Sequence, residues 1–109
     1  MKDNKTDVQI SADVTQAVNV IKSAILQSQS RAVRMISGTQ LSLYFGVGLY
    51  VSANSRRGTW GTGAIDAISE QLRRELSGLR GFSAQNIRNM RQFAEFWQPF
   101  LIHSLWRAN

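Results

Sequence analysis

Apolar positions in this chain recur at intervals of three and four residues, the spacing that places side chains on one face of a helix. Residues 11–36 carry the first such stripe, with Ser11 or Asp13 as the expected N-cap. The stripe consists of Val14, Val18, Ile21, Ile25, Ala32, Met35 and Ile36. We expect this helix to bend or end in the polar stretch 27–31 or at 37–38, where a glycine disfavours helix.

Residues 41–51 are apolar on nearly all sides, which is typical of a central buried helix. Their aromatic and β-branched side chains also fit a strand, and this alternative stays open at the level of sequence. Gly46 and Gly48 would let a neighbouring element approach the backbone closely. The glycine-rich stretch 53–63 is expected to be a loop with Trp60 packed as its anchor, and whether it holds a small hairpin, or wing, stays open at the level of sequence.

A third helix is expected from Gly63 to Leu76, with Thr62 as its N-cap. Its inner stripe is Ile65, Ile68, Leu72 and Leu76. Residues 77–81 then form a turn. Together with the helix that follows, this order predicts a helix-turn-helix.

The last predicted helix begins at Ser83, which is a good N-cap residue. Phe82 and Ile87 flank the cap at the positions of a hydrophobic staple. The helix is expected to run to Trp97 and to stop at Pro99, with a short final helix over 100–106. Its predicted inner face is Ile87, Met90, Phe93, Ala94 and Trp97. The pattern as a whole predicts a mainly all-α domain over residues 11–109, preceded by a flexible tail of residues 1–10.

Positive charge is concentrated in one part of the chain. The formal net charge is +6, and residues 31–109 carry all of it, with ten arginines and no lysine against four carboxylates. A guanidinium offers a planar fork of donors that suits phosphates and guanine edges, so we expect a polyanionic partner. A GC-rich genome would also favour arginine, and the sequence leaves that interpretation open.

The outer face of the last predicted helix carries residues that suit contact with DNA bases. Four of them share this face at positions i, i+3, i+4 and i+7: Gln85, Arg88, Asn89 and Gln92. Arginine and side-chain amides form bidentate hydrogen bonds to base edges in a major groove. Six arginines are the candidates for phosphate contacts: Arg56, Arg57, Arg73, Arg74, Arg80 and Arg91. The competing interpretation is a helix face that is polar only for solubility.

The composition argues against a catalytic centre and against a metal site. The chain has no cysteine, one histidine (His103) and no lysine after Lys22, so we expect no metal site, no cofactor and no catalytic centre. The glycine-rich loop 58–63 lacks the spacing of nucleotide-binding loops, and remains either a phosphate contact or a tight structural turn. No apolar run reaches the roughly 20 residues of a membrane span, and the start does not resemble a signal peptide. We therefore expect a cytoplasmic protein with no membrane partner.

The segment 96–106 is unusually apolar for the end of a small domain. It contains Phe96, Trp97, Phe100, Leu101, Ile102, Leu105 and Trp106. Part of this set would complete the core. An exposed remainder would be an interface for a second copy of the chain or for another protein.

Three strings carry a resemblance to a known family. They are LYFGVG at 43–48, WGTGAI at 60–65 and RGFSAQNIRNMRQF at 80–93. They resemble the N-terminal domain of the YhcG family, whose pattern contains L-Y-W-x-I-G, W-G-x-x-x-I-x-x-L-x-x-D-L and G-F-S-x-x-N-L-x-x-M-R-x-F. The third string matches at nearly every marked position. Departures are Phe45 for the usual Trp, Gln71 for Asp and Ser77 for Pro.

The resemblance implies a helical, winged-helix-like domain of bacterial origin that precedes a nuclease domain of the PD-(D/E)XK type. It implies a role in binding double-stranded DNA or targeting it for that nuclease, whose own residues are absent from this chain. The alternative is a protein-interaction or oligomerisation module that docks a partner or a nuclease subunit. Arginines clustered with the 83–97 helix would favour DNA, whereas scattered arginines with an exposed apolar patch would favour protein.

Overall fold

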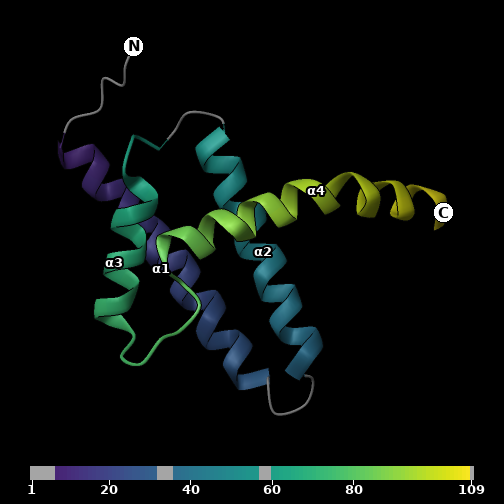
Figure 1. The fold of residues 1–109 in the computed structure, drawn as a ribbon, viewed down its shortest axis with the longest axis horizontal. Coiled ribbons are helices and arrows are strands. Elements are labelled where there is room, and N and C mark those ends of the chain that lie inside the picture. The colour runs from purple at the N-terminus through teal and green to yellow at the C-terminus, as the bar shows by residue number, and fades with distance from the viewer. Residues whose placement is uncertain (1–6, 32–35, 57–59, 109) are drawn as a thin grey trace.

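The computed structural model describes residues 7–31, 36–56 and 60–108, and these form four helices. Helix α1 spans Asp7–Arg31, α2 spans Ile36–Arg56, α3 spans Ala64–Glu75 and α4 spans Ala84–Ala108 (Figure 1). The described residues contain no strand, which confirms the all-α prediction. No helix among them has the length and apolar character needed to cross a membrane.

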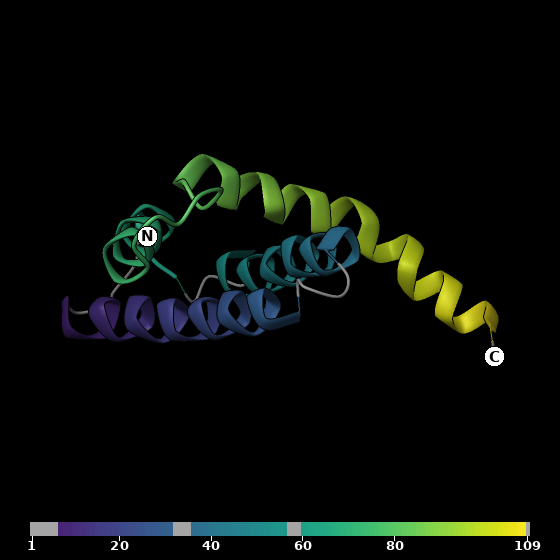
Figure 2. The same cartoon turned by 90° about the horizontal axis from the view of Figure 1, so that it is seen from below.

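The helices are arranged in layers. Helices α1 and α4 lie on opposite sides of the molecule, and α2 and α3 lie between them (Figure 2). The predicted stripes meet in the space between these layers. The largest fully buried side chains come from all four helices: Val18, Ile21, Val51, Ile68, Leu72 and Ile87. The core therefore holds together residues that are far apart in the sequence.

Helix α2 settles the alternatives left open for the middle of the chain. The strand alternative for residues 41–51 is wrong, because the whole stretch is helical. The helix extends to Arg56, so the expected loop begins later than predicted. Residues 53–56 are helical and 60–63 form a turn, while residues 57–59, Arg57 among them, lie outside the described residues. Trp60 packs against the core and stacks edge-on with Tyr50 at 6.0 Å, as an anchor should.

The first and third helices begin elsewhere than predicted. Helix α1 starts at Asp7, so Ser11 and Asp13 lie inside it and are not N-caps; no Gly or Pro interrupts residues 7–13. The remaining residues of the predicted tail, 1–6, lie outside the described residues, as do Ala32 and Met35. Helix α3 is capped by Gly63, not by Thr62. Gly63 has a φ of 84°, a left-handed conformation that glycine adopts without strain.

The prediction that α4 stops at Pro99 is wrong. The helix continues to Ala108 and includes Pro99 within it. Pro99 has no N–H to donate to the carbonyl of Glu95, and an interior proline of this kind bends a helix. Figure 2 shows α4 changing direction in its yellow C-terminal part. Trp97, expected in the core, is 44% exposed because this part of α4 extends beyond the helices that could cover it.

Candidate nucleic-acid interface

A network of hydrogen bonds builds the turn between α3 and α4. Ser83 caps α4: its Oγ accepts from the Asn86 backbone N–H at 3.1 Å, which confirms the predicted N-cap. The Asn86 side chain donates to the Gly81 carbonyl at 2.7 Å. On the other side, the buried Ser69 hydroxyl of α3 donates to the Phe82 carbonyl at 2.7 Å. The G-F-S-x-x-N string is therefore the part of the sequence that fixes how α4 leaves α3.

The predicted base-reading face lies at the start of α4. Gln85, Asn89 and Gln92 are exposed, as the sequence predicts for an outer face. The Gln85 amide donates to Asn89 Oδ1 at 3.1 Å, and the Asn89 amide donates to Asn86 Oδ1 at 3.3 Å. These weak, solvent-exposed bonds leave amide donors and acceptors that can exchange to another polar surface.

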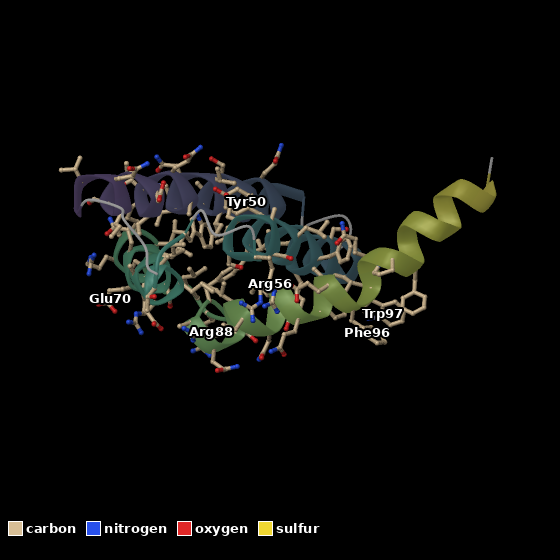
Figure 3. All side chains as sticks on the ribbon, turned by 90° about the horizontal axis from the view of Figure 1, so that it is seen from above. Tyr50, Arg56, Glu70, Arg88, Phe96 and Trp97 are labelled. Atoms are coloured by element: carbon tan, nitrogen blue, oxygen red, sulfur yellow. The ribbon has the colours of Figure 1, made fainter. Side chains whose placement is uncertain are left out.

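Arg88 belongs to the same face but is tied to α3. Its Nη2 lies 3.3 Å from both carboxylate oxygens of Asp66, and the Arg88 side chain is 35% exposed. Figure 3 shows Arg88 at the N-terminal end of α4. An exposed ion pair of this kind contributes at most about 1 kcal/mol to stability, so a stronger anion can displace the carboxylate.

Helix α3 presents two further predicted phosphate contacts. Arg73 and Arg74 are 65% and 60% exposed and share one carboxylate, Glu70, at 2.7 and 3.5 Å. Arg80 lies exposed in the turn and forms no ion pair with another described residue. One positive charge from the first pair and the charge of Arg80 therefore remain uncompensated on this side of the molecule.

Two other predicted phosphate contacts lie at a different place, where α2 meets α4. Arg56 donates to the Glu95 carboxylate at 2.8 and 3.1 Å, Ser52 donates to it at 2.7 Å, and Arg91 lies 3.9 Å away. The Arg56 hydrogen bond is the main reason that the pKa of Glu95 falls to about 2. We call Ser52, Arg56, Arg91 and Glu95 the junction cluster. In Figure 3 Arg56 lies between α2 and α4.

Arg91 is the clearest error in the predicted site. It was expected on the outer face, but its side chain is only 18% exposed and its Nε is buried without a hydrogen-bond acceptor among the described residues. The reason is that α4 crosses α2, which covers one flank of α4 as well as its inner stripe. Arg56 and Arg91 are thus engaged with Glu95 within the fold, apart from Arg73, Arg80 and Arg88.

Sequence reasoning missed three residues that shape this region. Ser69 could have been found, because it is a lone hydroxyl beside the inner stripe of α3. Nothing in the sequence indicated that Asp66 and Glu95 have partners, since each looks like an ordinary carboxylate on a solvent-exposed helix face. Their arginine partners lie 22 and 39 residues away in the chain, a distance that no local pattern reports.

The α3–α4 turn leaves too little room for a typical small-molecule ligand. A shallow hollow of about 180 Å³ lies at the α3–α4 turn, below the roughly 300 Å³ of a typical ligand site. It is lined by Ser69, Arg73, Leu79, Gly81, Phe82 and Ser83. No group of three or more His, Cys, Asp or Glu suited to a metal ion occurs in the part of the chain that the structure describes.

Comparison with known proteins agrees with the strings found in the sequence. A family described as the DUF1016 N-terminal domain matches residues 20–107, which covers most of the chain. This is the N-terminal domain of the YhcG family, so the resemblance is confirmed. No curated protein and no solved structure matches the chain.

Proposed function

The chain belongs to the family of DUF1016 N-terminal domains, and we propose that it binds double-stranded DNA through α3, the turn 76–83 and the first half of α4. In this proposal it catalyses no reaction itself and acts in the bacterial cytoplasm as the targeting domain of a PD-(D/E)XK nuclease. The nuclease association rests on the YhcG resemblance. The DNA interface rests on the arrangement of charge and amides around the turn.

The observation that carries the proposal is the uncompensated positive charge beside an exposed amide face. The positive charges of Arg73, Arg74 and Arg80 outnumber the one carboxylate, Glu70, that pairs with them. Arg73 lines the same hollow as Gly81, Phe82 and Ser83, and Arg80 lies in the turn that leads into α4. Phosphate contacts of this kind supply most of the affinity for DNA. Gln85, Asn89 and Gln92 face solvent on the first half of α4. Amides in such a position can hydrogen-bond to base edges.

Arg88 would join this surface by exchanging partners. Its guanidinium is held by Asp66 in the free protein, across an exposed 3.3 Å ion pair. A phosphate or a guanine edge offers the same bidentate geometry as a carboxylate. The fixed turn between α3 and α4 keeps the guanidinium and the amides on one rigid surface, because Ser69, Ser83 and Asn86 all bond across it.

Fluorescence anisotropy with a random-sequence duplex at several salt concentrations tests the proposal. We expect micromolar binding that weakens steeply with salt. Arg80→Gln should reduce the slope of log K against log salt by about 0.9, the value for one lost phosphate contact. Lys22→Gln is the control: it removes one positive charge that lies on α1 and is already paired with Glu75 of α3, so no proposed phosphate contact is lost and the slope should change less than in Arg80→Gln.

Arg91 is unsuited to this test, because its side chain is only 18% exposed and lies within the fold beside Glu95. If the protein shows no salt-dependent binding even at low ionic strength, the DNA interface is wrong. The protein-interaction module then becomes the better description, and the arginines around the turn serve solubility. Equal loss of slope in Arg80→Gln and Lys22→Gln would show diffuse attraction without the proposed surface.

A further inference from the structure

Three aromatic side chains form an exposed group on the second half of α4. Phe96 stacks on Trp97 with ring centroids 5.2 Å apart, and Phe100 lies 5.6 Å from each of them. The three residues are 61%, 44% and 54% exposed. We call them the aromatic cluster. Residues of this kind are normally covered, and together they form the kind of apolar patch that marks an interaction surface.

The cluster lies where the body of the protein cannot cover it. The second half of α4 extends past the other helices (Figures 1 and 2), and Phe96 and Trp97 point away from α1 and α2 (Figure 3). The radius of gyration is 15.0 Å, against about 13 Å for a compact domain of this length. The accessible surface is 7475 Å², against roughly 6000 Å² for a folded monomer of this mass.

We propose that the aromatic cluster is a homodimer interface, in which α4 of one copy packs against α4 of a second copy across a two-fold axis. A two-fold arrangement places each cluster against the same surface of its partner and so buries both. Because the second half of α4 extends past the other helices, it is open to such an approach. The proposal does not depend on DNA binding.

The absence of charged residues from the segment 96–106 removes an obstacle to the pairing of two copies. Residues 96–106 contain no Asp, Glu, Lys or Arg, although the chain carries a net charge of +6. Two copies meeting here therefore bring no like charges together over this stretch. A nucleic-acid stacking platform would need cationic side chains beside its aromatic rings, and this segment has none.

The aromatic cluster supplies part of the area that a dimer needs. Three aromatic side chains of about 150–250 Å² each, roughly half exposed, supply on the order of 300 Å² per copy. A standard interface needs about 800 Å² from each partner. The three rings therefore supply the apolar centre of the proposed interface and less than half of its area. In the sequence, the cluster is followed by four more apolar residues, Leu101, Ile102, Leu105 and Trp106.

Light scattering coupled to size exclusion tests the proposal with the full chain. We expect twice the 12.2 kDa mass of one copy, dissociating on dilution by mass action. The double variant Phe96→Ser/Phe100→Ser should shift the dissociation constant upward by at least about tenfold. Val20→Ser, which truncates an exposed apolar residue on α1, is the matched control and should leave the mass unchanged.

The fold of each variant is checked by circular dichroism, and both truncate exposed side chains, so both should remain helical. A wild-type protein that is monomeric over the whole concentration series overturns the proposal. So does a dimer that Phe96→Ser/Phe100→Ser leaves intact, because the two copies would then meet elsewhere.

Discussion

Gly48 is the residue on which the packing of α2 against α4 depends. A Cβ added there would overlap the carbonyl oxygen of Met90 and lie 2.8 Å from the Cβ of Ala94. The backbone of α4 thus passes directly over a position that has no side chain. Gly46, two residues earlier, has no atom within 4 Å of the same added Cβ. The sequence suggested a close approach for both glycines, and the structure confirms it for Gly48 alone.

Alanine at these two positions should therefore have opposite effects. Gly48→Ala forces α2 and α4 apart, and we expect it to lower the free energy of unfolding by about 3 kcal/mol or more. Gly46→Ala meets open space within a helix and should raise the free energy of unfolding by up to about 1 kcal/mol, through helix propensity. Urea unfolding followed by circular dichroism measures both. Similar losses for the two variants would contradict this packing.

At the scale of elements, α4 serves three purposes along its length. Its first turns carry the amide face, its middle packs on α2, and its second half carries the aromatic cluster. The junction cluster joins the middle of α4 to the end of α2 by hydrogen bonds from Arg56 and Ser52 to Glu95. This cluster therefore adds polar contacts to the packing of α4 against α2.

The junction cluster should give the fold a defined dependence on pH. The pKa of Glu95 is about 2 in the folded protein, below the roughly 4.3 of an unfolded chain. A depressed carboxyl pKa stabilises the fold above the unfolded value, and this stability is lost as the pH falls from about 4.3 toward 2. We expect Glu95→Gln to lower the melting temperature at neutral pH.

The same variant should lose less stability than the wild type when the pH is lowered to about 3, because it has no carboxyl group to protonate there. Thermal melts at the two pH values measure this. Glu75 also has a lowered pKa, owing to Gln71 and Lys22, and stays in both proteins as a common background. Parallel curves for wild type and variant would show that Glu95 does not couple folding to pH.

The pair Asp66–Arg88 offers a test of the α3–α4 surface itself. Asp66→Asn removes a negative charge and releases the Arg88 guanidinium, so we expect DNA binding at low salt to tighten by roughly threefold to tenfold. Glu75→Gln makes the same change of charge beside Lys22 of α1 and should have a smaller effect. Anisotropy titrations compare the two variants. Equal tightening would mean that Arg88 has no special place in the interface.

Local signals in the sequence were enough to predict the turn before α4. They were not enough to predict which other helix covers α4. Ser83 acts on the backbone N–H of Asn86, three residues later, so the N-cap was visible in the string. The burial of Arg91 and the exposure of Trp97 depend on where α2 crosses α4, which is decided at Gly48.

The same limit holds for the candidate site. Gln85, Asn89 and Gln92 could be placed on an outer face from helical periodicity alone. The carboxylate partners of Arg88 and Arg56 could not, because residue type and spacing do not report contacts between distant helices. The sequence therefore predicted which surface is polar, and only the fold divides its arginines into those held by Glu95 and those near the turn.

For the whole molecule, the two proposed surfaces lie toward opposite ends of α4. The polar and basic surface is at its start, and the aromatic cluster is on the half that extends from the body (Figure 3). A dimer formed through the second half would leave both DNA-binding surfaces free. Two tethered binding surfaces raise the apparent affinity for a long duplex, since the second contact becomes intramolecular.

Dimerisation should therefore strengthen DNA binding only where the duplex can hold two copies. On a long duplex we expect Phe96→Ser/Phe100→Ser to weaken binding by about tenfold or more, although neither residue belongs to the proposed DNA surface. On a duplex long enough for one copy alone, the same variant should bind like the wild type, because its arginines and amides are unchanged. Anisotropy on the two duplexes, at equal salt, separates these cases. Equal weakening on both would mean that the aromatic cluster itself contacts DNA, and no weakening on either would mean that the dimer does not present its two basic surfaces to one duplex.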